Sequence, residues 1–228
     1  MPQTARMPRS LPSLHSVPVA NASLAGLGAF VFVATAMQWV RADLDWAFSP
    51  LSFYLVGNLG PVLKTAYVGL ALALMLIGLQ FFHALRPGAR SDLAPWLFGT
   101  SSLAVLATAF ADTQLPGGRM TTAAFVHAIA APIAFLTVTV AMLLQSWHLR
   151  LDPAWRHRFA VAFVLALASF GGLWVHALVR EWPRGLTQRG VILVILAWLA
   201  LAATWLRAAA LRNQGLGATP PSTVRSSS

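Results

Sequence analysis

Six apolar stretches follow one another along the chain, and each approaches the roughly 20 residues that an α-helix needs to cross a bilayer. These stretches are rich in Ala, Leu and Val, and they cover about 21–40, 62–85, 94–111, 122–147, 159–179 and 191–206. Backbone groups in lipid must be hydrogen-bonded internally, so continuous apolar runs predict helices. A transmembrane barrel is excluded because its strands would alternate apolar and polar residues. The sequence therefore predicts an all-α polytopic membrane protein, a bundle of six transmembrane helices.

The composition excludes several classes of protein. Charged residues make up 10% of the 228 residues and hydrophobic residues 57%, whereas typical soluble domains are about 25% charged. The chain has no Cys, which excludes disulfides, thiolate metal sites and a Cys nucleophile. The net charge of +10 does not indicate nucleic-acid binding, because the basic residues are scattered between apolar runs and do not form one soluble face.

The Lys and Arg residues predict the orientation of the bundle. Ten of the 16 basic residues fall in the two tails and the even-numbered loops, and six fall in the odd-numbered loops. Because the cytoplasmic side is richer in Lys and Arg, we expect both termini in the cytoplasm and the first, third and fifth loops outside. Trp residues near the span ends are typical of an interfacial aromatic belt. The bilayer is thus the first partner, and the inner (plasma) membrane of a bacterium the expected location.

One transmembrane domain, 21–211, is expected between two disordered tails, 1–20 and 212–228, which are rich in Pro or in Gly, Pro and Ser. An alternative concerns the first span. Arg6 and Arg9 precede an apolar run that ends in Ala34-Thr35-Ala36, a pattern similar to a cleaved signal peptide. We favour an uncleaved first helix, because cleavage would place the basic C-terminal tail outside.

Ionisable residues within membrane spans are costly and are therefore functional candidates. Asp112 ends the third span, His127 lies about two turns into the fourth, His176 lies near the end of the fifth, and Arg189 begins the sixth. Arg180 is expected one turn beyond His176 on the same helix face. The sequence thus predicts one polar layer on the outer side of the membrane.

Four interpretations of this layer stay open. Asp112, His127 and His176 are a ligand set suited to zinc or another divalent ion with an open position for water, and Ser52 could add a hydroxyl to such a hydrolytic site. No HxxxH or HExxH pair supports it. In a second interpretation, His127 and His176 ligate one haem.

The third interpretation is an anion or lipid-headgroup site, in which Arg180, Arg184 and Arg189 contact a phosphate or carboxylate. The fourth is a structural hydrogen-bond network in which Asp112 pairs with Arg189 and the histidines connect helix ends. Lys64, at the start of the second span, is expected to extend to the outer surface.

Four short motifs resemble one family of bacterial membrane proteins, the domain of unknown function 998. They are Phe48-Ser49-Pro50-Leu51-Ser52-Phe53-Tyr54-Leu55-Val56-Gly57, Phe110-Ala111-Asp112, Val126-His127-Ala128, and Gly185-Leu186-Thr187-Gln188-Arg189 with Trp198 further along. The resemblance covers about 24–211. It implies a six-helix integral membrane protein of the bacterial envelope, supplies no mechanism, and singles out Ser52, Asp112, His127 and Arg189.

The chain departs from the family pattern at three positions. Ala111 stands where the family often has Pro, and Gln188 stands where it often has Glu, which removes a charged pair with Arg189. His176 has no counterpart in the pattern, which weakens the two-histidine metal site. A looser likeness is to membrane hydrolases of the alkaline ceramidase type, which combine Ser, Asp and His around zinc; a seventh helix and the paired histidines are missing here.

We therefore predict an inner-membrane protein that binds or handles a lipid or small amphiphile through an outward-facing polar cluster. The first alternative is a metal-assisted membrane hydrolase, with Ser52, Asp112, His127 and Arg189 as catalytic candidates and Asp112, His127 and His176 as metal ligands. The second alternative is a non-catalytic membrane scaffold.

Overall fold

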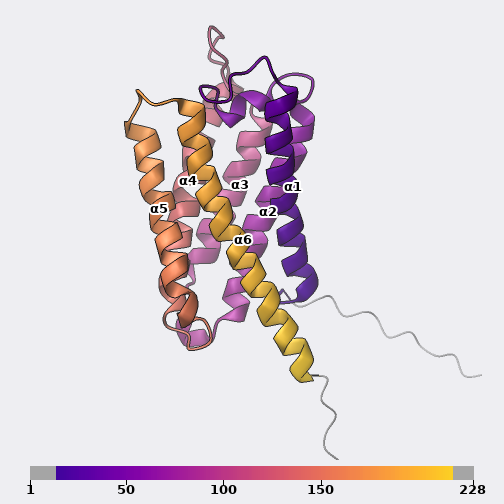
Figure 1. The fold of residues 1–228 in the computed structure, drawn as a ribbon, viewed down its shortest axis with the longest axis vertical. Coiled ribbons are helices and arrows are strands. Elements are labelled where there is room, and N and C mark those ends of the chain that lie inside the picture. The colour runs from indigo at the N-terminus through magenta and orange to yellow at the C-terminus, as the bar shows by residue number, and fades with distance from the viewer. Residues whose placement is uncertain (1–13, 218–228) are drawn as a thin grey trace, which may run out of the picture.

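A computed structural model describes residues 14–217 of the chain, and these residues form an all-helical bundle (Figure 1). Six of its helices are long and apolar enough to cross a membrane. They are α1 (Val17–Val40), α2 (Gly60–Ala84), α3 (Leu93–Phe110), α4 (Thr122–Leu149), α5 (Phe159–Leu178) and α6 (Arg184–Gly217). Short 3₁₀ helices interrupt three connections: η1 (Leu51–Leu55), η2 (Pro87–Ala89) and η3 (Arg156–Arg158).

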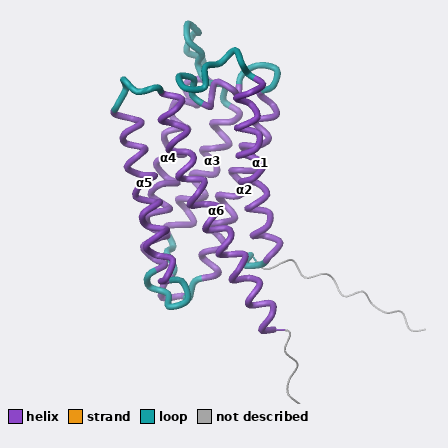
Figure 2. Tube along the Cα trace, viewed as in Figure 1, coloured by secondary structure: helices purple, strands orange, loops and turns teal. Residues whose placement is uncertain are grey.

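The helices run up and down, so the chain enters α1 and leaves α6 at the same end of the bundle (Figure 2). We call this the termini end, and we call the opposite end, which holds the α1–α2, α3–α4 and α5–α6 connections, the distal end. Each helix packs against the next one along the chain, and α6 also packs against α1 and α2. The bundle is therefore closed, with α6 returning to the first two helices.

Aromatic side chains fill the core toward the termini end. Phe81 of α2, Phe98 of α3 and Trp198 of α6 are almost fully buried. The Trp198 ring centroid lies 5.9 Å from that of Phe98 and 6.1 Å from that of Phe81. The indole Nε1 donates to Ser146 Oγ of α4 at 3.1 Å, which satisfies a polar group that would be costly to bury alone. This cluster connects four helices.

The predicted spans agree with the first five helices to within a few residues, and the sixth helix is longer than predicted. α6 has 34 residues, about 51 Å at 1.5 Å per residue, and its C-terminal end extends past the rest of the bundle (Figure 1). Its first turns carry polar residues that an apolar window does not include. The helices begin at Val17 and end at Gly217, so these parts of the predicted tails are helical; residues 1–13 and 218–228 lie outside the described part.

Helices α1 and α2 approach each other closely where two glycines face one another. A Cβ atom on Gly26 would overlap the carbonyl oxygen of Gly69, and one on Gly69 would lie 3.4 Å from Gly26 Cα. Small residues at a helix crossing allow backbones to pack tightly in a membrane, where van der Waals contact drives association. Gly28 lies two residues along the same helix, and a Cβ atom there would have no neighbour within 4 Å.

Gly26→Ala is expected to destabilise the fold, because the added methyl group meets a rigid backbone carbonyl. The expected loss is on the order of 1–3 kcal/mol, typical of overpacking, and thermal unfolding in detergent measures it. Gly28→Ala is the matched control and should unfold at the wild-type temperature or slightly above it. Equal unfolding temperatures for the two variants would contradict the close α1–α2 approach.

Candidate functional site

A cavity of about 390 Å³ lies in the distal half of the bundle, within the range of about 300–1,000 Å³ typical of small-molecule sites. Helices α2 to α6 line it, with contributions from Phe30 of α1 and from η1. On α6 the lining extends from Arg184 to Leu199, a rise of about 22 Å. Its deep walls are mostly aliphatic and aromatic: Leu70, Leu74, Val105, Phe135, Val138, Leu173, Ile192, Ile195, Leu196 and Leu199.

Six polar side chains of the cavity gather at its distal end. They come from five separate segments: Ser52, Thr113, His127, His176, Arg184 and Gln188. Among the described lining residues, none is Asp or Glu. The cavity therefore has an apolar deep part and a distal end with hydroxyl, imidazole, amide and guanidinium groups but no carboxylate.

Two of the deeper polar side chains do not add hydrogen-bonding capacity to the wall, because they are bonded to backbone. Ser101 Oγ donates to Ala134 O at 3.0 Å, and Thr108 Oγ1 donates to Ala104 O at 2.8 Å. Tyr67 differs from them: it lines the cavity, and no side chain or backbone group in the described range accepts from its hydroxyl. Tyr67 is thus the one phenol that a ligand in this cavity could contact.

His127 lies early in α4, whose start is fixed by an N-cap: Thr121 Oγ1 accepts from Ala124 N at 3.1 Å. The imidazole is 5% exposed, and its Nδ1 lies 2.8 Å from Ala111 O. A carbonyl only accepts, so Nδ1 carries the proton and the neutral ring has an unprotonated Nε2. The acceptor is a backbone carbonyl, so Ala111 can accept this hydrogen bond as well as the Pro that often stands at this position in the family that the chain resembles.

His176 makes an analogous contact one helix further along. Its Nδ1 lies 2.8 Å from Thr187 Oγ1, and that hydroxyl lies 3.2 Å from both Pro183 O and Arg184 O. The hydroxyl can donate to one of these carbonyls while it accepts from Nδ1. Arg184 Nη1 also donates to His176 O at 2.7 Å. These bonds connect the end of α5 to the first turn of α6.

The α1–α2 connection, 41–59, docks on the first turns of α6. Leu186 N donates to Ala47 O at 2.8 Å, and Leu51 N donates to Gln188 Oε1 at 2.7 Å. A Glu at this position would accept the same bond, so the change to Gln keeps the contact. This docking places η1, and with it Ser52, at the distal end of the cavity.

Arg189 stabilises the same docking through hydrogen bonds of its guanidinium group. Its Nη1 donates to Trp46 O at 2.6 Å and to Ser49 O at 2.9 Å, and the guanidinium lies 5.5 Å from the Tyr54 ring centroid. A Cβ on Gly185 would lie 2.5 Å from both carbonyl oxygens, so only glycine permits the approach. Arg189 is not among the residues that line the cavity, and it acts as a positioning residue.

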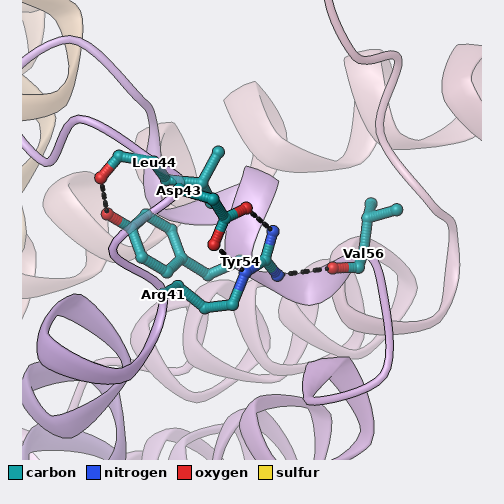
Figure 3. Close-up of polar contacts among 5 residues, drawn as sticks. All are labelled: Arg41, Asp43, Leu44, Tyr54 and Val56. Carbon is teal, nitrogen blue, oxygen red and sulfur yellow. Dashed lines mark hydrogen bonds and ion pairs between the residues drawn. The ribbon is translucent and has the colours of Figure 1, made fainter.

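A second anchor holds the other part of the connection (Figure 3). Arg41 Nε and Nη2 donate to the two carboxylate oxygens of Asp43, each at 2.8 Å, and Nη1 donates to Val56 O at 2.8 Å. The Arg41 guanidinium lowers the pKa of the Asp43 carboxyl below its ordinary value. Burial raises the pKa of Tyr54, whose protonated hydroxyl donates to Leu44 O at 3.4 Å.

Asp112 pairs with Lys64, and the expected pair of Asp112 with Arg189 is wrong. Lys64 Nζ lies 2.8 Å from Asp112 Oδ1, which connects the start of α2 to the end of α3. Lys64, which is expected to extend to the outer surface, forms this exposed ion pair at the distal end. Arg180 lies beyond the end of α5 at Leu178, so it does not share a helix face with His176 as predicted.

The described residues do not form a three-ligand metal site. No group of three His, Cys, Asp or Glu residues within 14–217 is placed to hold a metal ion. Asp112 is paired with Lys64, whereas Nδ1 of His127 is bonded to Ala111 O and Nδ1 of His176 to Thr187 Oγ1. Of the predicted site residues, Ser52, His127 and His176 share the cavity, and Asp112 and Arg189 lie outside its lining.

Comparison with known proteins identifies the family. The family described as Protein of unknown function (DUF998) matches residues 24–205. The chain belongs to this family. Neither the curated proteins nor the solved structures gave a match.

In this DUF998 protein the four motifs make contact in two pairs. The first motif, in the α1–α2 connection, is bound by the fourth, at the start of α6, through Gln188 and Arg189. The second and third meet where His127 bonds to Ala111 O. The motifs are therefore best interpreted as the contacts that close the distal end of the bundle.

Sequence analysis missed Tyr67 and Thr187 as site residues and treated Gln188 only as a departure from the family. A signal for Tyr67 exists in the sequence, because it is one of two Tyr residues in the chain and the one inside a predicted span. Thr187 has no such signal. Its role depends on the proximity of His176 across the α5–α6 connection.

Arg189→Ala is expected to release the docked α1–α2 connection, since Trp46 O and Ser49 O lose their donor. The loss of hydrogen bonds to a charged group, about 1.5–3 kcal/mol, should accelerate amide exchange in 44–56 by about tenfold or more. Hydrogen-exchange mass spectrometry in detergent measures this. Arg180→Ala, at an exposed arginine, is the control; similar acceleration in both variants would refute the positioning role.

The Arg41–Asp43 anchor predicts a dependence on pH. Because the pKa of Asp43 is lowered in the folded protein, its contribution is complete above the ordinary value of about 3.9. It is lost as pH falls through the lowered pKa. The unfolding-temperature difference between wild type and Asp43→Asn should therefore be small, present at neutral pH, and absent once pH is well below 3.9. A difference that grows on acidification would contradict this sign.

Proposed function

We propose that the protein binds a lipid or small amphiphile, with the apolar chain in the cavity and the polar group at the distal end. The observation that carries this proposal is the segregation of the lining: aliphatic and aromatic side chains from Ile192 to Leu199 of α6, a rise of about 10 Å, and Ser52, His127, His176, Arg184 and Gln188 at one end. A molecule with one apolar and one polar part matches both regions.

The polar end must supply the selectivity. A chain that leaves the bilayer for an apolar cavity gains little hydrophobic free energy, because lipid tails are as apolar as the walls. Hydrogen bonds to the headgroup then decide which lipid or amphiphile the cavity prefers. Nδ1 of His127 is bonded to Ala111 O and Nδ1 of His176 to Thr187 Oγ1, which leaves Nε2 of each ring for a ligand, while Arg184 and Gln188 offer N–H donors.

We further propose that the distal end faces outside, with both termini in the cytoplasm of a bacterial cell and the protein in its inner membrane. The basic residues support this orientation: by sequence, ten of the 16 Lys and Arg residues fall in the two tails and the connections of the termini end, and six fall on the distal side. Positive charge is enriched on the cytoplasmic side of membrane proteins. The ligand would then enter from the outer leaflet or the outer solution.

A hydrolase is the second candidate, because Ser52, His127 and His176 all line one cavity. The metal-assisted form would need ligands beyond the two histidines, since Asp112 is paired with Lys64. Metal analysis of protein purified without chelator separates the candidates: stoichiometric zinc that is lost in His127→Ala would favour the hydrolase over binding alone. A scaffold would tolerate His127→Ala without change in either metal or lipid content.

Ile192→Trp is expected to fill the cavity and reduce lipid binding, because Ile192 lines it. Native mass spectrometry of detergent-purified protein counts the lipids that remain bound. The expected result is a loss of the most strongly retained lipid, at least about tenfold in occupancy ratio, comparable to about 1.4 kcal/mol.

Leu193→Trp is the matched control, since the neighbouring Leu193 is 63% exposed on the bundle surface. It adds the same side chain on the same helix and should keep the wild-type lipid. Retention of the same lipid by folded Ile192→Trp, or no retained lipid in the wild type after exposure to total membrane lipids, would refute the cavity as the binding site.

A further inference from the structure

Arg158, at the termini end, is a buried guanidinium held by aromatic rings alone. It is 9% exposed, and its Cζ lies 4.6 Å from the Trp155 ring centroid and 5.4 Å from that of Trp205. Its Nη1 is shut off from solvent without a hydrogen-bond partner. No acceptor in the described range bonds to any of its guanidinium nitrogens.

Six other arginines of the described part have at least one acceptor, although Nε and Nη2 of Arg189 are buried without one. Arg41 bonds to Asp43 and Val56 O, Arg86 to Leu151 O, Arg90 to Leu85 O, Arg184 to His176 O, Arg189 to two carbonyls and Arg207 to Asn21. A buried charge without a partner costs several kcal/mol. Nε and Nη2 of Arg158 are neither hydrogen-bonded nor shut off from solvent, so this edge of the guanidinium, oriented by the two rings, is available to an external acceptor.

The surroundings of Arg158 favour an anion. Arg158 is the N-cap residue of α5, and no side chain caps this helix, although its first N–H, on Phe159, is bonded to Arg156 O of η3. The positive end of the helix dipole lies beside Arg158. Arg212 of α6 lies close enough for its charge to act on Arg158. The nearby carboxylate of Asp152 is already bonded to Arg86 N and Ala154 N. Both ion pairs found within 14–217 lie at the distal end.

We propose that Arg158, the first turn of α5 and Arg212 bind the phosphate of an anionic phospholipid at the termini end. A planar guanidinium matches two phosphate oxygens, and this bidentate geometry is among the strongest charge-assisted contacts. The site is separate from the distal cavity and does not rest on the function proposed for it.

The position of the site indicates a lipid as the source of the phosphate. Arg158 lies in the α4–α5 connection at the termini end, and two tryptophans that are not fully buried lie near it. Trp205 contacts Arg158 itself, and the Trp147 ring centroid lies 6.2 Å from that of Phe159, the next residue. Tryptophan is enriched at the headgroup level of bilayers, and basic residues on that side attract anionic lipids.

The test uses the full chain, delipidated in an uncharged detergent, with Ile192→Trp present so that the distal cavity is filled. Thermal unfolding is followed while dioctanoyl phosphatidylglycerol, dioctanoyl phosphatidylcholine or inorganic phosphate is added. The two variants are Arg158→Gln and Arg156→Gln. Arg156 is two residues away and exposed, so both variants change the net charge equally.

The expected result is stabilisation by phosphatidylglycerol in the parent and in Arg156→Gln, with binding at least about tenfold weaker in Arg158→Gln. Equal weakening in both variants would overturn the site in favour of diffuse charge attraction. Equal stabilisation by phosphatidylcholine would overturn the preference for anionic lipid, and equal stabilisation by inorganic phosphate would overturn a lipid as the source of the phosphate.

If Arg158→Gln shows no folded transition, the comparison of Arg158→Lys with Arg156→Lys replaces it. Only Arg158→Lys should weaken binding, because it loses the planar guanidinium.

Discussion

The distal half of the bundle depends on the docking of the α1–α2 connection on the start of α6. Trp46 O and Ser49 O of this connection are turned onto the start of α6, where Arg189 is their donor, and a buried carbonyl left without a donor costs about 1–3 kcal/mol. Arg189, Gln188 and Leu186 supply or accept the necessary bonds, and Gly185 provides the space. Non-helical backbone is tolerated at this level because protein covers it, and the cavity beneath it consequently has a formed distal end.

Helix number and most helix bounds could be predicted from the sequence because lipid leaves the backbone few alternatives. The start of α6 could not be predicted from hydropathy, because its first turns include Arg184, Thr187, Gln188 and Arg189. These residues are helical because they contact the α1–α2 connection and His176. Such contacts join segments far apart in the chain, for example 137 residues between Leu51 and Gln188, and no local pattern contains them.

The depth of the site residues was predictable, and their partners were not. Depth follows from counting residues along a helix, whereas a neighbour is decided by rotation, and one residue turns an α-helix by about 100°. Ser52, His127 and His176 share the cavity as expected from depth. Asp112 lies at the same level but contacts Lys64 of α2 instead of Arg189, so the predicted layer divides into a cavity group and a surface ion pair.

The two ends of the molecule offer different chemistry to a lipid. The cavity lining on α6 ends at Leu199, at the depth where Trp198 stacks with Phe98 and contacts Phe81. An almost fully buried aromatic cluster at that depth is poorly suited to a polar path between the two ends. For the proposed ligand, this favours binding from the distal side over passage through the bundle.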